Sequence, residues 1–180
     1  MLFRSFGGWR RDRSGLCPPN MRVEYWRVEP PGIPAAFWRS VGPLHNIFVT
    51  ESWRNWRLRR SRIPSHSDGI CSASRPANTV LELAAEKGGW GLPLPQGFGR
   101  GVALQFVVAT YMAQIAEVEV SRDGSVRIRR VVCAVDCGIS VNPDTVGAQL
   151  QSVMFGVTAS LCGEITLKDG CVQQIDFDDY

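Results

Sequence analysis

The sequence predicts an α+β fold built from antiparallel hairpins and one long, capped helix. Residues 122–124 (Arg-Asp-Gly) and 168–170 (Lys-Asp-Gly) have the composition of tight turns between antiparallel strands. Asn142 and Pro143 predict a helix start, because asparagine accepts a hydrogen bond from an unpaired backbone amide and proline has no amide hydrogen to lose. Strand and helix patterns do not alternate in repeated strand-helix-strand units, so a parallel sheet is not expected.

The elements in the first half are short. Residues 21–29 alternate as a strand does and end at Pro-Pro-Gly, and residues 79–87 form a short helix that two glycines stop. Residues 93–99, rich in proline and glycine, are expected to form a loop. The overlapping run Gly-Phe-Gly-Arg-Gly at 97–101 is a weak phosphate-loop pattern, because no strand-loop-helix unit surrounds it, and we interpret it as a connection.

A strand at 113–120 is expected to pair with a strand at 125–132 through the turn at 122–124. The first of these strands alternates between apolar and acidic residues, with Ala116, Val118 and Val120 on one face and Glu117 and Glu119 on the other. This alternation predicts an apolar face and a charged face.

The long helix that starts at Pro143 carries one apolar stripe. Spacings of four, three, four and four residues separate its members, which are Val146, Leu150, Val153, Val157 and Leu161. That periodicity predicts a helix of roughly five turns with one apolar side.

Composition and cysteine usage exclude several classes of protein. The chain has 180 residues, of which 44% are apolar, and this suits one domain with a core. No apolar run approaches the roughly 20 residues that a membrane helix requires, and no secretory signal is expected at the start, so the compartment is not specified. Six unevenly spaced cysteines do not indicate a disulfide framework. Cys133 and Cys137 would lie about 13 Å apart on a strand, too far to share a metal ion.

Five collinear blocks resemble one family of enzymes. They are FWRSVGPLHNIFVTES (37–52), VLELAAEKGGWGLPLPQGFGRGVAL (80–104), YMAQIAEVEV (111–120), VVCAVDCGISVNPDTVGAQ (131–149) and GEITLKDGCVQQIDF (163–177). In that order they resemble the large, molybdenum-binding subunit of the xanthine dehydrogenase and aldehyde oxidase family, and within it the isoquinoline 1-oxidoreductase beta-subunit group. The resemblance implies that residues 1–52 and 80–180 are parts of a molybdopterin-binding domain, with 53–79 between them.

The resemblance also implies which residues bind the cofactor. Trp38, Arg39 and Ser40 match a turn beside the molybdenum, where an arginine is suitable because its fork of donors stays charged. Gln149 matches a glutamine that hydrogen-bonds the cofactor at the start of the long helix. For both Arg39 and Gln149, an ordinary exposed side chain is the alternative. The group usually has one more small residue after this glutamine, and losing one residue rotates everything downstream by about 100° on a helix. Either Gln149 or the later stripe is therefore expected to be displaced.

No catalytic residue and no metal ligand is assigned within the chain. Family members use a glutamate in a Gly-Glu-Pro motif as the general base, and the 180 residues contain no such motif. Glu164 belongs to an earlier block and is followed by isoleucine. The chain is expected to be truncated before the motif and therefore inactive alone.

The resemblance implies an oxidoreductase that hydroxylates N-heterocycles or aldehydes with water as the oxygen source. Its cofactor would be molybdenum-molybdopterin in the cytosine dinucleotide form, which we do not expect this chain to retain. The implied partners are a small iron-sulfur subunit and a small-molecule substrate. Nucleic acid is not an expected partner, and no membrane span is expected.

The charge is unevenly distributed. Residues 1–78 hold 13 arginines against 5 acidic residues, a charge of +8, whereas residues 79–180 carry −5. Residues 53–79 hold the main arginine cluster without periodicity, and we expect them to form a loop or to be disordered.

Three interpretations of residues 53–79 remain open. The first is a frameshift, because back-translation of residues 54–79 read one base earlier can spell the alanine-rich helix found in the family. The second is a solvated loop. The third is a non-catalytic module whose arginine-rich first half binds an anionic partner.

Overall fold

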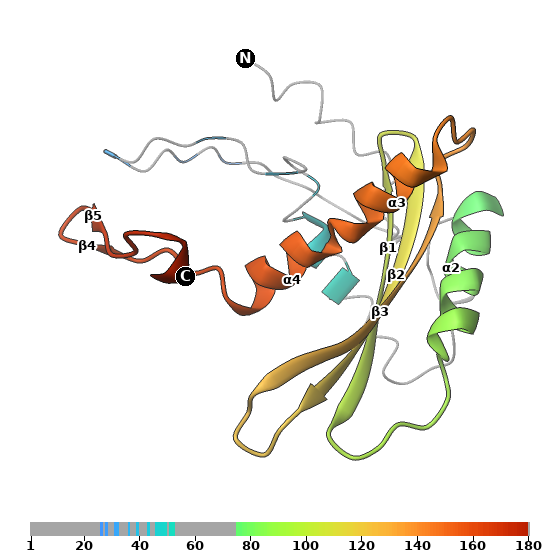
Figure 1. Cartoon of the computed structure of the whole chain (residues 1–180), viewed down its shortest axis with the longest axis horizontal. Coiled ribbons are helices and arrows are strands. Elements are labelled where there is room, and N and C mark those ends of the chain that lie inside the picture. The colour runs from blue at the N-terminus through green and yellow to red at the C-terminus, as the bar shows by residue number, and fades with distance from the viewer. Residues whose placement is uncertain are drawn as a thin grey trace. The chain divides into compact units, whose positions relative to one another are not determined.

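The computed structural model describes residues 26, 28, 31–32, 36, 39, 43, 46–49, 51–52 and 75–179 (Figure 1). The chain divides into two compact units, Met1–Cys137 and Gly138–Tyr180, and each is described by itself. Within the described residues, no helix is long and apolar enough to cross a bilayer.

From residue 75 onward, the first unit is a helix packed on a three-stranded antiparallel sheet. The elements of this part are α2 (Arg75–Gly88), β1 (Phe98–Val107), β2 (Thr110–Val120) and β3 (Val126–Asp136). The strands follow one another in the order β1-β2-β3, and α2 lies along one face of the sheet (Figure 1). The expected α+β class with antiparallel hairpins is confirmed.

The core lies between α2 and the sheet. The helix contributes Val80, Leu81, Ala84 and Ala85, and the strands contribute Val102, Ala113, Ile115 and Ala134. Val102 and Ile115 are opposite each other in the register, as are Ala113 and Ala134. This face of β2 also carries Glu117. The glutamates of β2 thus lie on the same face as the core residues Ala113 and Ile115. Small residues in the core allow the helix to approach the strands closely.

Two-residue and longer turns join the strands. The turn predicted at 122–124 is confirmed: Gly124 has φ 89°, and the side chain of Asp123 accepts the backbone N–H of Ser125 at 3.0 Å. The β1–β2 turn was not predicted. Its two residues, Val108 and Ala109, have φ of 50° and 58°.

Strand β1 corrects the interpretation of residues 97–101. Only Gly97 belongs to the preceding loop, where its φ is 85°; Gly99, Arg100 and Gly101 lie within β1. The glycines do not interrupt the strand, because each is opposite a β2 residue in an unbroken register.

The second unit contains the predicted long helix. α3 (Pro143–Gln151) and α4 (Val153–Leu161) are separated by Ser152, and the side chain of Asn142 accepts from the amides of Asp144 and Thr145, which confirms the predicted cap. The remaining elements are β4 (Leu167–Lys168), β5 (Cys171–Val172) and the 3₁₀ helix η3 (Phe177–Asp179). The turn predicted at 168–170 joins β4 to β5, with Asp169 and Gly170 at φ of 51° and 79°.

None of the residues in α3 and α4 is buried, so the apolar stripe predicted for this helix is not a covered face in this structure.

Two expectations fall largely outside the described residues. The strand expected at 21–29 is described only at Trp26 and Val28, which are exposed and belong to no strand. Residues 53–74 lie outside the described residues. The expected loop at 53–79 is wrong at its end, because residues 75–79 are helical. They begin α2, which starts four residues before the helix predicted at 79–87.

Candidate functional site

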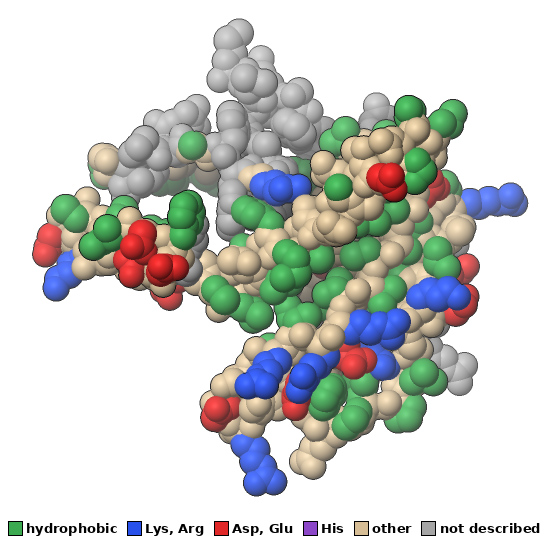
Figure 2. Space-filling view, viewed as in Figure 1, with side chains coloured by type: hydrophobic (Ala, Val, Ile, Leu, Met, Phe, Trp, Pro, Cys, Tyr) green, Lys and Arg blue, Asp and Glu red, His purple; other side chains and the backbone are tan. Residues whose placement is uncertain are grey.

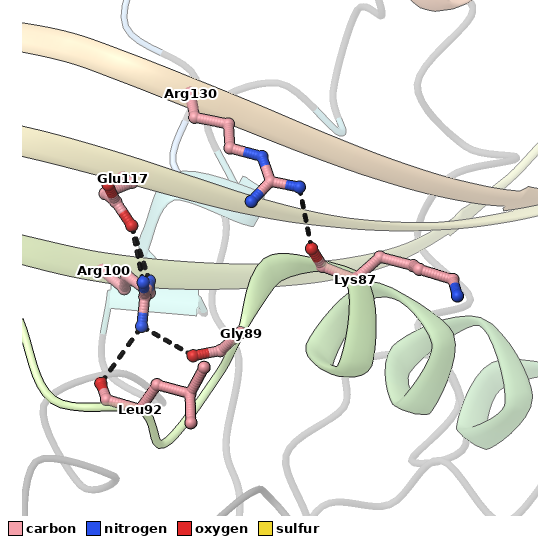
Figure 3. Close-up of polar contacts among 6 residues, drawn as sticks. All are labelled: Lys87, Gly89, Leu92, Arg100, Glu117 and Arg130. Carbon is pink, nitrogen blue, oxygen red and sulfur yellow. Dashed lines mark hydrogen bonds and ion pairs between the residues drawn. The ribbon is translucent and has the colours of Figure 1, made fainter.

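A polar network surrounds the C-terminal end of α2. The Arg100 guanidinium forms an ion pair with Glu117 at 2.7 Å and donates to the carbonyl oxygens of Gly89 and Leu92 at 2.6 and 3.1 Å (Figure 3). Arg130 donates to the carbonyl oxygen of Lys87 at 2.9 Å. Arg130 thus caps a carbonyl group in the last turn of α2, at the end where the helix dipole favours positive charge, and Arg100 binds carbonyl groups of the loop that follows the helix.

This network is structural, because all of its donors and acceptors named above serve to attach the end of α2 to the sheet. Arg100 and Glu117 are mostly buried, which strengthens their interaction relative to an exposed pair. No local sequence signal identifies this network, because Arg100 and Glu117 are 17 residues apart and become opposite only when β1 pairs with β2.

The structure describes one of the three residues expected in the molybdenum-side turn. Arg39 lies in a turn and is exposed, in the first unit. Trp38 and Ser40 lie outside the described residues.

Gln149 is exposed on α3, in the second unit. Within the described part of the chain, no hydrogen-bond partner is recorded for its side-chain amide, while its backbone carbonyl accepts the N–H of Ser152 at 3.2 Å. Gln149 and Arg39 belong to different units, so the two candidates are each described separately.

The helix is irregular directly after Gln149. Ser152 has φ −64° and ψ −3°, and Phe155 donates to its carbonyl oxygen at 3.0 Å, a hydrogen bond between residues three apart rather than four. The irregularity lies between Gln149 and the later apolar residues, where the sequence predicted a displacement.

The sheet carries alternating charges at the β2–β3 hairpin. Basic and acidic side chains are interspersed there (Figure 2), and Arg129 forms an ion pair with Glu119. The arginine cluster at 54–62, on which the anionic-partner hypothesis depends, lies outside the described residues.

The cysteines in the described part of the chain do not form a metal site. In the described ranges, no three His, Cys, Asp or Glu side chains lie close enough together to hold a metal ion. Burial raises the pKa of the Cys133 thiol, and a hydrogen bond with Gln114, the opposite residue on β2, acts against that rise.

Comparison with known proteins identifies the family. Residues 82–180, more than half of the chain, match the molybdopterin cofactor-binding domain, so the chain belongs to that family. It is also similar to the isoquinoline 1-oxidoreductase subunit beta of Brevundimonas diminuta, with 30% identity over 157 residues. The alignment covers 82% of this chain and 20% of the relative, so the chain spans about a fifth of the subunit's length. No solved structure matches the chain.

The match confirms the expected family. The chain is thus related to part of the molybdopterin-binding subunit of molybdenum hydroxylases, and the relative's name marks that protein as one subunit of an enzyme.

The exposed residues fit a polar, anionic cofactor. The amide of Gln149 is exposed and can both donate and accept, and Arg39 presents a guanidinium at the surface. Neither is sequestered in the hydrophobic core of α2 and the sheet. Both side chains can therefore contact a ligand without disrupting that core.

Proposed function

We propose that the chain forms part of the wall of a molybdopterin cofactor site in a molybdenum hydroxylase that hydroxylates N-heterocycles or aldehydes with oxygen from water. The observation that carries the proposal is the family match over residues 82–180, which spans the second half of α2, the sheet and the whole second unit. The name of the similar subunit supports an N-heterocycle as the substrate class.

Arg39 and Gln149 are the proposed cofactor-binding residues, together with Trp38 and Ser40. The guanidinium of Arg39 offers a fixed fork of donors for oxo or phosphate groups. The Gln149 side-chain amide offers N–H donors and a carbonyl acceptor in the last turn of α3. The cofactor, in its cytosine dinucleotide form, supplies the redox chemistry when bound.

The chain alone is proposed to be inactive. A general base is typically worth about 10²–10⁴-fold in rate, and the Gly-Glu-Pro motif that supplies it in the resembled family does not occur in the 180 residues. A small iron-sulfur subunit is the proposed electron-transfer partner.

The test is cofactor content in a longer gene product that contains these residues and the rest of the subunit. We expect molybdenum and pterin to copurify, and Arg39→Ala or Gln149→Ala to lower both. Gln151→Ala is the matched control, because Gln151 is exposed on the same helix two residues further on. Equal cofactor content in Gln149→Ala and Gln151→Ala would remove Gln149 from the site.

An anionic-partner function makes a different prediction for the chain. Binding to nucleic acid that weakens steeply with salt, with no molybdenum in the longer product, would contradict the proposed function.

We also propose that residues 54–79 derive from a frameshift. The aperiodic arginine composition and the alanine-rich alternative frame support it. Sequencing the gene with flanking bases tests it, and an intact frame on independent templates would contradict it.

A further inference from the structure

Glu51 is a buried charged side chain far in sequence from the core that it adjoins. It is 7% exposed, and its Oε2 accepts the backbone N–H of Leu104 at 2.8 Å, across 53 residues of chain. Removing a carboxylate from water is unfavourable unless hydrogen bonds compensate for the lost solvation. The contact with Leu104 is therefore a specific one.

Leu104 lies at a fixed place on the sheet. It belongs to β1, an edge strand in the order β1-β2-β3, and is opposite Ala113 on the paired side. Its side chain packs against the hydrophobic core. Amides along the outer edge of a sheet lack a strand partner, and here a carboxylate accepts one of them.

Of the described apolar side chains in the segment that carries Glu51, Ile47 is half-buried, whereas the other two are exposed. Residues 46–49 and 51–52 are helical, yet Phe48 and Val49 are 73% and 65% exposed. Those two side chains do not attach the segment to the sheet. A charge-assisted hydrogen bond is directional and short, so it fixes position more narrowly than apolar contact does.

Arg39 lies twelve residues before Glu51, in the same unit. We propose that Glu51 is a positioning residue for the cofactor site: by binding the Leu104 amide, it holds the helical residues 46–49 and 51–52, which follow Arg39 in the sequence, on the outer edge of β1. The consequence for the cofactor rests on the proposed function. The attachment itself does not.

The first experiment measures the attachment in the full chain, without cofactor. Amide exchange at Leu104 and residual dipolar couplings of residues 46–49 are compared between the unchanged chain, Glu51→Ala and Glu51→Gln. Losing a hydrogen bond to a charged group corresponds to roughly a tenfold to hundredfold change, so Leu104 should exchange faster by that factor in Glu51→Ala. The couplings of 46–49 should fall toward zero while those of β1 are kept. Glu51→Gln retains an acceptor oxygen and should largely restore both.

A matched control is Glu82→Ala, because Glu82 is an exposed glutamate on α2. It should leave the exchange at Leu104 and the couplings unchanged. The proposal is overturned if Glu51→Ala leaves them unchanged, or if Glu51→Gln is as disruptive as Glu51→Ala. If Glu51→Ala does not fold, the dipolar couplings of Glu51→Gln and of the unchanged chain decide. In each of these two proteins, one alignment tensor must fit the couplings of both residues 46–49 and β1, and the proposal is overturned if it does not.

The second experiment measures molybdenum content in the longer gene product. Glu51→Ala should lose molybdenum and Glu51→Gln should retain it. Unchanged molybdenum in Glu51→Ala, with Leu104 exchange accelerated, overturns the positioning role and leaves the proposed function standing. No molybdenum in the unchanged protein counts against the proposed function, and the exchange and coupling data still decide the attachment.

Discussion

Replacing Gly88 by alanine tests how closely α2 packs on the sheet. A Cβ atom at Gly88 would lie 2.9 Å from Cδ1, 3.0 Å from Cγ2 and 3.1 Å from Cβ of Ile115. Ile115 is 2% exposed at the centre of the core, so its side chain has little room to move away. Overpacking a core costs about 1–3 kcal/mol.

The gain in helix propensity from glycine to alanine offsets part of this cost. It reaches about 1 kcal/mol in a helix interior, but Gly88 is the last residue of α2, so the gain there is smaller. We therefore expect Gly88→Ala to lower the free energy of unfolding by about 1–2 kcal/mol. Urea unfolding followed by tryptophan fluorescence measures it, since Trp90 packs against the core.

Two further variants make the test specific. Gly156→Ala is the matched control, because Gly156 is helical in α4 and an added Cβ meets nothing within 4 Å, so it should not destabilise. Ile115→Val removes Cδ1, the nearest of the three atoms. The Gly88→Ala, Ile115→Val double variant should thus be less destabilised than the sum of the single variants, by at least about 0.5 kcal/mol. Additive effects, or a neutral Gly88→Ala, would refute the close packing.

Three other outcomes are expected. Val108→Asn with Ala109→Gly should stabilise the chain by about 1–2 kcal/mol, because both turn residues have positive φ and Asn-Gly suits such a turn; an unchanged or lower urea midpoint would contradict this. At pH 8, iodoacetamide should modify Cys133 more slowly than the exposed Cys162, since burial raises the pKa of the Cys133 thiol. Because this pKa is raised in the folded state, the free energy of unfolding should fall as the pH rises from the ordinary thiol pKa through the folded-state pKa. Equal labelling rates for the two thiols would count against both effects. The purified chain alone should hydroxylate no N-heterocycle or aldehyde with a dye acceptor, and sustained turnover free of host hydroxylases would disprove that.

Local signals predicted the turns and the helix cap. Asp-Gly at 123–124 and 169–170 and Asn142 before Pro143 act through their own backbone and the next few residues, so their effect is visible in a short window. Strand β1 was missed for the opposite reason. Gly99 and Gly101 weaken its local strand pattern, and only pairing with β2 stabilises it.

Long-range contacts could not be predicted. Glu117 was interpreted as part of a charged face, because its partner Arg100 is 17 residues away and on another strand. The contact between Glu51 and Leu104 spans 53 residues and has no periodic signature. The candidate cofactor residues came from resemblance to a family rather than from geometry, and Arg39 and Gln149 remain predictions.

The order of the strands along the chain has a consequence for how the protein reaches its structure. α2 precedes β1, and β1, β2 and β3 pair with their immediate neighbours in sequence, so α2 and the sheet can assemble through short loops. Topologies of this kind fold quickly, because little chain entropy is lost before contacts form. The attachment of Glu51 to Leu104 closes a much longer loop and needs an edge strand already in place. The sheet and its helix should therefore form first during synthesis or refolding, and residues 46–49 and 51–52 should dock last.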